Sequence, residues 1–539
     1  MKGTRSKDAQ VAHGFSRACA VPAGLKASAT SNRHTPGIDR REFCFASAAA
    51  LVGMSIKGDR PLAGGFVNDD IAIGHTIRGR IAVSPATTTV RIPAVVVGGG
   101  MAGLSAAWRL QKRGFDRFVL LELAANAGGN SRSGQNDVTG YPWGAHYVPI
   151  PDERATYVRE LFAELGLLKP DGSWDERHLC MSQQERLFIH GRWQEGIEPA
   201  IGLTADDRDQ FRRFGELTAA LHASGRFTVP LDNGLSDEDA SLDRVSFAAW
   251  LADHGFDSKP LLWYANYACR DDYGALTTGV SAWAGLHYFS SRDNDEKGPL
   301  TWPEGNGWIV KRLLERVGRF VRAGQPVRAI QREKSVFRVR AGDTEYVCDA
   351  VIFAAPTFLA PYLIEGGQPI AGCEYSPWMT ANLTLETIPD LDRGEPAWDN
   401  VIMSSPALGY VDAMHQSLRS VAGRTVWTFY WSLAEMEPSA ARAFLVAKDW
   451  AYWKEAVLTD LERVHPRIRT CVSRLDVMRI GHAMVRPTVG AVFSTQRRAL
   501  KRSRDRLVFA HSDVSGLSIF EEAQFRGVTA ADRVLRLIA

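Results

Sequence analysis

The first organised pattern along the chain is a short apolar run, a glycine-rich turn and a helical segment. Ala94–Val97 is an unbroken run of apolar residues, which is typical of a parallel strand buried on both faces. Leu104–Leu110 then has helical character, Gly114 ends that helix, and Phe118–Leu121 is a second apolar run. These segments predict one βαβ unit.

Further along the chain, helical and strand-like patterns alternate. Between residues 154 and 165 the apolar side chains recur at helical spacing, and Gly166 follows, which predicts an amphipathic helix. The same criteria predict helices after Gly307, over 449–464 and over 521–537, and strands at 337–340, 350–353, 425–431 and 507–510. This alternation indicates an α/β protein.

Length and composition allow two large domains or three smaller ones. The chain has 539 residues, of which 45% are hydrophobic and 23% charged, enough for a sizeable core. The formal net charge is +3, from 64 basic and 61 acidic residues, whereas a nucleic-acid binder needs a concentrated basic field. We therefore expect no nucleic-acid partner, and we interpret the basic run at residues 497–504 as a solvated turn before a strand.

The seven cysteines form no recognisable motif. No two are closer than 25 residues, which excludes the close cysteine pairs of redox and structural zinc sites, and no metal site is predicted. Two of the seven lie near the N-terminus, and the other five are predicted to be mostly buried thiols.

The N-terminal region carries a candidate export signal. Arg40-Arg41 precedes a short Ala-rich apolar stretch at residues 44–56. This arrangement resembles a twin-arginine signal, and it predicts export of the folded chain by the twin-arginine machinery to the periplasm or another exported location. The tail before the arginines is long and no clear cleavage site follows; without a working leader the protein would be cytoplasmic. No other segment reaches eighteen consecutive apolar residues, so no membrane span is expected in the mature chain.

The turn after the first strand has the spacing of a dinucleotide-binding loop. In Gly98-x-Gly100-x-x-Gly103 the first glycine permits a tight turn, the second lets the backbone approach a pyrophosphate, and the third lets helix and strand pack closely. The helix begins near Met101, and its N-terminus favours an anion. Glu122, nineteen residues beyond Gly103, follows the second strand and is placed to bind ribose hydroxyls.

A second glycine turn narrows the choice of dinucleotide. Gly128-Gly129 follows the acidic residue and precedes Asn130. Here the chain resembles the flavin amine oxidase superfamily, which includes phytoene desaturases and protoporphyrinogen oxidases, and in which this doublet brings backbone against the pyrophosphate of FAD. The resemblance implies FAD as the cofactor. Asn130 stands where the superfamily usually has arginine, and our hypothesis is that Arg132 compensates the phosphate charge instead.

Other segments between residues 92 and 539 resemble the superfamily in the same order. They are the loop Thr139–Tyr147 beside the flavin ring, the glycine turn Pro303–Gly307, the strand Asp349–Pro356, and the C-terminal segments Phe509–Asp513 and Glu521–Ala523. In the resemblance, the terminal helix points its N-terminus at the flavin. The cofactor-binding residues that it implies are Gly98, Gly100, Met101, Ala102, Gly103, Glu122, Gly129, Asn130, Arg132, Gly144, Val327, Asp513, Glu522 and Ala523.

The same resemblance predicts how the chain divides into domains. The fold class is α/β, with a Rossmann-like FAD-binding domain formed by residues 92–165, 300–358 and 470–539. A second, mixed α+β substrate domain is formed by residues 166–299 and 359–469. Residues 1–57 make up the export signal region, and residues 58–91 a linker or a loosely attached strand.

Catalytic residues are less well marked than cofactor-binding ones. Thr301 occupies the position where amine oxidases of the superfamily usually carry a lysine, and Ile519 the position of an expected aromatic residue. His146 is a candidate for the substrate pocket and His482 for contact with, or covalent attachment to, the flavin, each against a structural role. The segment Arg270–Asp272 offers either an acidic pair for a cationic substrate or an internal ion pair.

These features predict an FAD-dependent oxidoreductase. It would remove a hydride from an amine-type small-molecule substrate, and oxygen or a carrier would accept the electrons. One alternative is a desaturase or isomerase-like enzyme acting on an apolar lipid, which an exposed apolar entrance would favour. The other is a non-catalytic flavin-binding carrier or assembly subunit, which the missing lysine favours.

Overall fold

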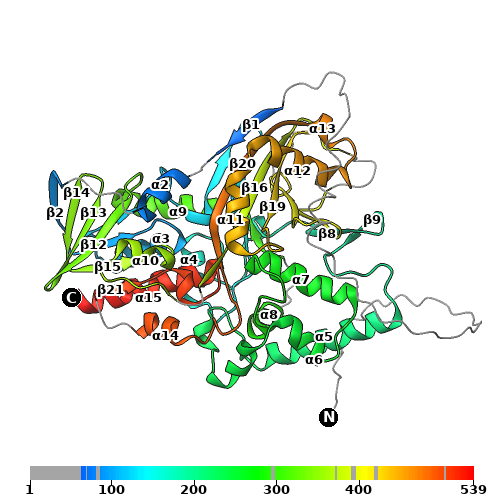
Figure 1. Cartoon of the computed structure of the whole chain (residues 1–539), viewed down its shortest axis with the longest axis horizontal. Coiled ribbons are helices and arrows are strands. Elements are labelled where there is room, and N and C mark those ends of the chain that lie inside the picture. The colour runs from blue at the N-terminus through cyan, green and yellow to red at the C-terminus, as the bar shows by residue number, and fades with distance from the viewer. Residues whose placement is uncertain are drawn as a thin grey trace, which may run out of the picture. The chain divides into compact units, whose positions relative to one another are not determined.

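Short apolar runs form the strands of a parallel five-stranded sheet (Figure 1). The structure is a computed structural model that describes residues 62–67, 70–79, 85–292, 298–370, 373–389, 396–417, 423–502 and 506–538. The predicted export signal lies outside these residues. The order across the sheet is β11 (Val321–Arg322), β4 (Phe118–Leu121), β3 (Ala94–Val97), β15 (Ala350–Phe353) and β21 (Leu507–Phe509). The predicted βαβ unit is confirmed.

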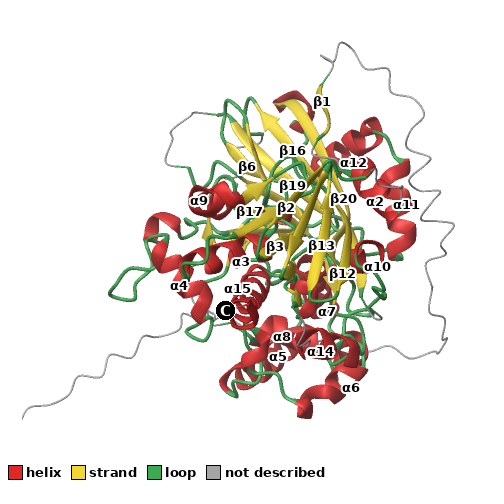
Figure 2. Ribbon diagram, turned by 90° about the vertical axis from the view of Figure 1, so that its left-hand side faces the viewer, coloured by secondary structure: helices red, strands yellow, loops and turns green. Residues whose placement is uncertain are grey.

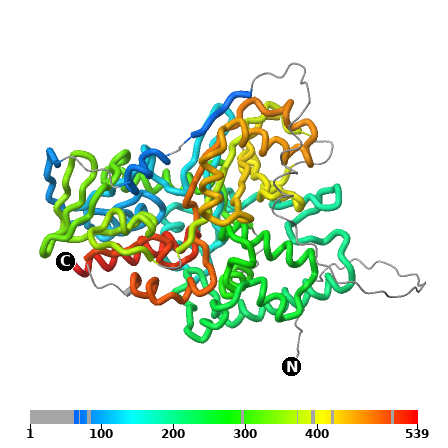
Figure 3. The backbone as a smooth tube through the Cα atoms, viewed as in Figure 1, coloured from blue at the N-terminus to red at the C-terminus, as the bar shows by residue number. Residues whose placement is uncertain are grey.

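Alternate residues of β3 reach two different cores, because successive side chains point to opposite faces of a strand. Its first and third residues pack under a layer of helices, α3 (Met101–Lys112), α9 (Gly307–Val317) and α15 (Phe520–Ile538). Figure 3 shows the C-terminal part of the chain, in red, beside the N-terminal part in blue. A side chain at Gly527 of α15 would overlap the carbonyl oxygen of Ala102 in α3, so glycine permits this close helix crossing.

A four-stranded sheet covers the other face of the parallel sheet. The second and fourth residues of β3 pack against it in one shared core. Its order is β12 (Val327–Glu333), β13 (Val336–Ala341), β14 (Thr344–Cys348) and β2 (Thr88–Arg91). Both faces of the parallel sheet are therefore covered, as its continuous apolar runs require.

An eight-stranded mixed sheet forms most of the remaining β structure (Figure 2). Its order is β1 (Ala63–Phe66), β20 (Val472–Arg486), β16 (Glu374–Leu385), β19 (Thr425–Trp431), β18 (Gly409–Asp412), β17 (Asp399–Ile402), β8 (Glu185–Ile189) and β9 (Arg192–Glu195). Three helices pack on it through a shared apolar core, α11 (Pro438–Ala447), α12 (Trp450–Glu462) and α13 (Ile468–Cys471). This sheet and the parallel sheet give the mixed α/β architecture that the sequence predicts.

A group of helices lies below the eight-stranded sheet in Figure 1, in green. These helices share an aromatic-rich core and are α5 (Ala205–Ala223), α6 (Phe247–Asp253), α7 (Lys259–Tyr273) and α8 (Ala282–Ser290). Two small antiparallel pairs link the layers, β5 (Ser133–Gln135) with β6 (Gly140–Pro142), and β7 (Tyr147–Val148) with β10 (Leu300–Thr301). The other helices are α4 (Thr156–Glu164), α10 (Ala360–Leu363) and α14 (Thr495–Arg502).

Most elements lie where the hydrophobic pattern predicts them. The helices α4, α9, α12 and α15 and the strands β13, β15, β19 and β21 match their predicted ranges to within a few residues. The five cysteines of the described chain are free thiols, four of them buried and Cys373 partly buried, as predicted. No helix among the described residues has the length and apolar character needed to cross a membrane.

Three segments differ from their predicted form. Residues 58–91, predicted as a linker or loosely attached strand, contain α2 (Ile71–Arg78) between β1 and β2, which pair with β20 and β14 in two different sheets. The basic run at 497–504 is largely the helix α14, where Arg498 and Lys501 pair with aspartates distant in sequence. β20 lies in the eight-stranded sheet, although residues 470–539 were assigned to the cofactor-binding part. In each case the structure depends on strand pairing or ion pairing between residues far apart in the sequence, and the local hydrophobic pattern does not predict such pairing.

Candidate functional site

Two glycine turns lie side by side at one edge of the parallel sheet. Gly100 begins α3, and no side chain caps its first turn, so those N–H groups are available to an anion. Gly98 has a φ of 103°, and a side chain at Gly103 would overlap the carbonyl oxygen of Gly98. Gly100 forms a bridge with Gly128, and the nearest described atom to a Cβ on Gly100 would be the Cα of Gly129, at 3.8 Å. The backbone thus leaves open space where the sequence predicts a pyrophosphate.

Glu122 holds the first glycine turn in place. Its Oε2 accepts the N–H of Gly99 at 2.6 Å, and its Oε1 accepts that of Ala124 at 2.8 Å. Burial raises the pKa of this carboxyl group, against the effect of both hydrogen bonds. The N–H of Gln325 donates to the carbonyl oxygen of Glu122 at 2.8 Å, which brings the start of β12, Val327, close to this acid. The residues predicted for ribose and for adenine are therefore neighbours.

Arg132 is already neutralised by a carboxylate. Its Nη1 lies 2.9 Å from the Oδ2 of Asp70, and its Nε donates to the carbonyl oxygen of Gly129 at 3.1 Å. Asp70 belongs to the segment predicted as a linker, and no local sequence pattern indicates its pairing with Arg132. The hypothesis that Arg132 offers a free charge to the phosphates is therefore not supported by its contacts. Asn130 instead donates from Nδ2 to the carbonyl oxygen of Ala483 at 2.6 Å.

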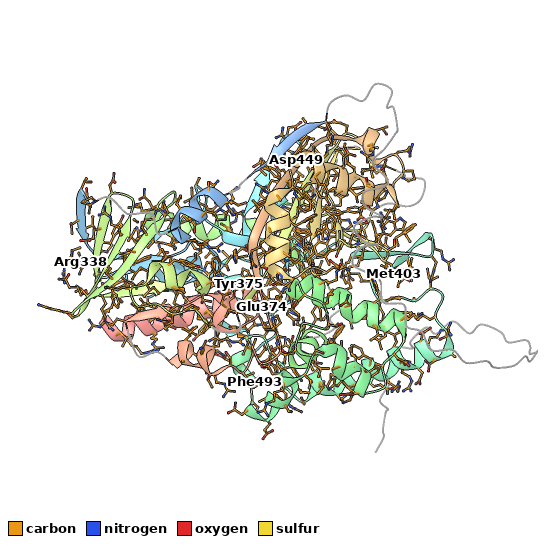
Figure 4. All side chains as sticks on the ribbon, viewed as in Figure 1. Arg338, Glu374, Tyr375, Met403, Asp449 and Phe493 are labelled. Atoms are coloured by element: carbon orange, nitrogen blue, oxygen red, sulfur yellow. The ribbon has the colours of Figure 1, made fainter. Side chains whose placement is uncertain are left out.

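One carboxylate oxygen of Asp513 binds protein groups, and the other has no hydrogen-bond partner among the described residues. Its Oδ2 accepts the N–H and the hydroxyl of Thr357 at 2.8 and 2.9 Å and the hydroxyl of Tyr375 at 2.5 Å, and its Oδ1 lies 2.9 Å from Nδ1 of His511. Burial raises the pKa of this carboxyl group, but His511 and the hydroxyl donors outweigh it and lower the pKa overall. Figure 4 labels Tyr375, at the start of β16, near the centre of the view. The side chain of Asp513 thus ties the end of β21 to the eight-stranded sheet.

Glu522 likewise faces the protein interior. Its Oε1 accepts the N–H of Leu231 at 2.5 Å, its Oε2 accepts the hydroxyl of Ser515, and burial raises the pKa of the group. Ala523 packs against the helical core. Both carboxylate oxygens of Glu522 are therefore bound by the protein, whereas Oδ1 of Asp513 has no hydrogen-bond partner among the described residues, which leaves it available for the predicted contact with the cofactor.

A cavity of about 500 Å³ opens beside the predicted flavin loop. At one side it is lined by Gly144, which belongs to the loop predicted to lie beside the flavin ring, and by Asn130 and Ala483. Other walls come from the helices α5, α7 and α8, from β16, β19 and β20, and from the first residues of α15. Glu198, which is exposed, also lines it. Segments that are far apart in the sequence therefore build one concave site.

Aromatic rings form a box around His146 at the wall of this cavity; Tyr147 and Tyr430 line the cavity with His146, and Trp398 is not among its lining residues. The imidazole stacks on Tyr430 with ring centres 4.9 Å apart and meets Tyr147 edge-on at the same distance. Trp398 approaches the imidazole at 5.4 Å, and the hydroxyl of Tyr430 donates to the carbonyl oxygen of Gly144 at 2.9 Å. Burial lowers the pKa of His146 to about 4, so its ring is neutral at pH 7. His146 lines the cavity as predicted.

The other two catalytic candidates do not line the cavity. Thr301 is fully buried, and its hydroxyl donates to the carbonyl oxygen of His146 at 2.9 Å, so it positions the backbone of that residue. His482 stacks on Phe358 with ring centres 4.2 Å apart, and burial lowers its pKa to about 3. Ile480, Ala483 and Met484 of β20 line the cavity, whereas His482 on the same strand does not.

The carboxylates of Asp271 and Asp272 face the cavity from the last turn of α7. Arg270 points elsewhere: its Nη2 donates to the carbonyl oxygen of Ala407 at 3.0 Å, and its Nε lies 3.2 Å from Glu435. Of the two predicted alternatives, the internal ion pair within this segment is therefore not formed. Burial, together with Asp272 and Glu185, raises the pKa of Asp271 to about 7; burial raises that of Asp272 to about 6, although Arg292 lowers it.

Sequence reasoning missed several residues of this cavity. Arg292 and Glu521 form an ion pair at 2.5 Å across it, and the second carboxylate oxygen of Glu521 has no hydrogen-bond partner among the described residues. Tyr430 and Trp378 come from strands of the other sheet. His287, predicted as a core residue, lines the cavity and hydrogen-bonds the carbonyl oxygen of Thr228. Within the described chain, no group of three or more His, Cys, Asp or Glu residues is arranged to hold a metal ion.

A parallel sheet that ends in two facing glycine turns, beside a cavity lined by aromatic residues, is typical of a dinucleotide-dependent oxidoreductase. The chain belongs to the flavin-containing amine oxidoreductase family, whose model matches residues 101–535. FAD is therefore its cofactor, and the uncapped start of α3 with the open space before Gly100 fits the pyrophosphate of that group.

Solved structures share this fold at low sequence identity. A putrescine oxidase bound to putrescine is 18% identical with a TM-score of 0.64, and the match covers 83% of this chain and 100% of the other. Cyclohexylamine oxidase from Brevibacterium oxydans IH-35A is 15% identical with a TM-score of 0.63, over 83% and 99%. A fatty acid isomerase from P. acnes is 15% identical with a TM-score of 0.59, over the same shares. No curated protein sequence matches the chain.

Proposed function

We propose that the protein is an FAD-dependent oxidase of amines. The observation that carries this proposal is the charge of the cavity. Its lining includes the carboxylates of Glu198, Asp271, Asp272 and Glu521 against one cationic side chain, Arg292, which is paired with Glu521. Because unneutralised carboxylates in a desolvated wall are costly, a cationic ligand gains by entering.

The aromatic box supports the same substrate class. A cation is attracted to the faces of tyrosine and tryptophan rings, and the cavity is lined by Tyr147, Tyr430 and Trp378 beside the neutral His146. FAD, when bound, accepts the hydride from the carbon next to the amine nitrogen. These rings would hold that carbon beside Gly144, which belongs to the loop predicted to lie along the flavin, and would shield it from water.

The proposed cofactor contacts combine the glycine turns with their neighbours. Backbone from Gly98 to Gly103 and at Gly129 would hold the pyrophosphate, Glu122 the ribose, and Val327 the adenine. Asn130 and Gly144 would lie along the flavin ring. The carboxylate of Glu522 holds the loop before α15, and the unpartnered Oδ1 of Asp513 would bind FAD.

Acidic residues in the cavity argue against the apolar-lipid alternative. A fatty chain would cover Asp271 and Asp272 without neutralising them, which leaves the desolvation cost of the carboxylates uncompensated. The large apolar residues that are exposed in the described chain are Ile73, Val245, Val446 and Val489, which are too few for a broad apolar entrance. Oxygen or a carrier would accept the electrons, and we propose that the twin-arginine leader exports the protein with FAD bound.

Anaerobic titration of the FAD-loaded protein tests the proposed function. We expect primary amines and diamines to bleach the flavin absorbance, and fatty acids of matched chain length to leave it unchanged. Bleaching by the fatty acids alone would refute the amine assignment in favour of the lipid alternative. If dithionite reduces the flavin but no amine or lipid does, the carrier alternative replaces both enzyme assignments.

A further inference from the structure

We propose that Asp271 takes the proton from the ammonium group of the substrate before hydride transfer. This inference rests on the proposed function, because it concerns an amine in the same cavity. Asp271 lines the cavity at the C-terminal end of α7, whose last turn is followed by Gly274 in the left-handed conformation. The partial negative charge at a helix C-terminus disfavours a carboxylate there, so a charged Asp271 at this position lowers the stability of the helix. Such a placement is characteristic of functional groups rather than of structural ones.

The groups around Asp271 leave its charge uncompensated. Its partner on α7, Arg270, is turned toward Glu435 and the carbonyl oxygen of Ala407. The other charged and titratable groups that act on Asp271, or on which it acts, are Asp272 and Tyr267 on α7, Glu185 on β8, Asp399 on β17, Tyr147 on β7, Tyr288 on α8 and Tyr430 on β19. These are acids and phenols. Arg270 attracts Asp271, but its effect on the pKa is smaller than those of burial, Asp272 and Glu185, and it does not line the cavity. An incoming ammonium group would bring a cation to the cavity side of Asp271, where two of these phenols, Tyr147 and Tyr430, also lie.

Asp272 differs from Asp271 in its surroundings, although the two are adjacent. Arg292 acts on Asp272, and the Arg292–Glu521 ion pair stands beside it with one oxygen of Glu521 unpartnered among the described residues. The attraction of Arg292, which lines the cavity, favours the charged form of Asp272, whereas the cation that acts on Asp271 is Arg270, which does not line the cavity and affects the pKa less than burial, Asp272 and Glu185 do. We therefore assign attraction of the cation to Asp272 and acceptance of its proton to Asp271. The unpartnered oxygen of Glu521, buried in the wall, independently indicates that a polar ligand completes this site.

The proton transfer removes a barrier to the redox step. In an ammonium ion the nitrogen lone pair is held in an N–H bond, so it does not assist departure of a hydride from the neighbouring carbon. One N–H bond breaks with its electron pair left on nitrogen, and an O–H bond forms on Asp271. The products are a neutral amine and a neutral carboxyl group, and the hydride then passes to FAD. At pH 7 an amine with a pKa near 10.4 is neutral in only about one molecule in several thousand, so a base in the cavity has a large effect.

The variant Asp271→Asn tests this role, with Asp272→Asn as the matched control. The rate of anaerobic flavin bleaching by a primary amine is measured from pH 6 to pH 10. In the wild type we expect the rate constant at low substrate to fall as the pH drops below about 7, where Asp271 becomes protonated. Asp271→Asn should lose about 10²-fold or more at pH 7 and recover toward wild type near pH 10, where the free amine is abundant. Asp272→Asn should weaken amine binding but keep the wild-type pH profile.

Two further measurements separate a proton acceptor from a structural residue. A fluorinated amine that is neutral at pH 7 should reduce Asp271→Asn at a near wild-type rate, which a folding defect would not allow. The affinity of the FAD-loaded protein for an unreactive quaternary ammonium ion, followed by fluorescence, should fall in both variants because both lose a charge. An Asp271→Asn profile parallel to that of the wild type would overturn the role of Asp271 while the amine function stands. Absence of bleaching by any amine in the wild type would overturn both.

Discussion

Replacing Tyr375 by phenylalanine should weaken the junction between the two large sheets. The hydroxyl of Tyr375, at the start of β16, donates to the buried carboxylate of Asp513, which follows β21. A hydrogen bond to a charged group contributes about 1.5–3 kcal/mol. We expect a loss at the lower end of this range, because Thr357 still donates two hydrogen bonds to the same oxygen.

The assay is urea unfolding of the FAD-loaded protein at pH 7, followed by tryptophan fluorescence and by flavin release. Tyr346→Phe is the matched control, since Tyr346 is half-buried on β14 and its hydroxyl has no hydrogen bond to a described residue; its change should stay within about 0.5 kcal/mol. A double-mutant cycle with Thr357→Val should show coupling, because both hydroxyls bind one carboxylate.

The pH dependence has a defined sign. The folded-state pKa of Asp513 is lowered from 3.8, so its contribution is fully present above 3.8 and is lost as the pH falls through the folded value. The difference between wild type and Tyr375→Phe should therefore be full at pH 7 and shrink below pH 3.8. Equal stabilities of Tyr375→Phe and Tyr346→Phe at pH 7 would refute the proposed junction.

Three other changes have defined outcomes. Gly103→Ala should abolish FAD uptake, measured by flavin absorbance after refolding with FAD, because the added methyl group would overlap a backbone carbonyl oxygen of the turn; a yellow variant would contradict this. Thr301→Val should retain FAD but lose about 1 kcal/mol of stability with the hydrogen bond to the backbone of the flavin loop, and slow flavin bleaching several-fold; unchanged bleaching would argue against its positioning role. Arg40→Lys together with Arg41→Lys should retain the protein in the cytoplasm on cell fractionation, whereas Arg33→Lys should not; equal export of both variants would remove the leader assignment.

The cofactor half of the site could be predicted because its signals are local. Gly98, Gly100 and Gly103 are needed for the backbone geometry of a single turn, and Glu122 follows at the end of the next strand. Because these residues are close in sequence, their spacing along the chain predicts their positions in the fold. The apolar runs of β3, β4 and β15 likewise report burial on both faces. A turn of this geometry requires glycine at particular positions within a few residues, so a short stretch of sequence is enough to predict it.

The acids and their partners could not be assigned in the same way. Asp70 neutralises Arg132, and Thr357 and Tyr375 engage Asp513, across separations in sequence that no periodicity records. As a result, the guanidinium group of Arg132, predicted to compensate the phosphate charge, is already paired with a carboxylate. Of the two carboxylate oxygens of Asp513, one is bound by Thr357 and Tyr375 and the other has no hydrogen-bond partner among the described residues. The sequence shows which residues can carry a charge. Whether that charge is neutralised depends on which residues of opposite charge lie beside it in the folded chain.

By itself the sequence determined the parallel strands, the glycine turns and the acidic residue that follows them, because each depends on interactions within a few dozen residues. Only the tertiary structure decided that Asp271 and Asp272 face an aromatic cavity while Arg270 turns away from it. The direction of each side chain follows from which helix face packs against which sheet, and that packing is settled by contacts between residues hundreds of positions apart.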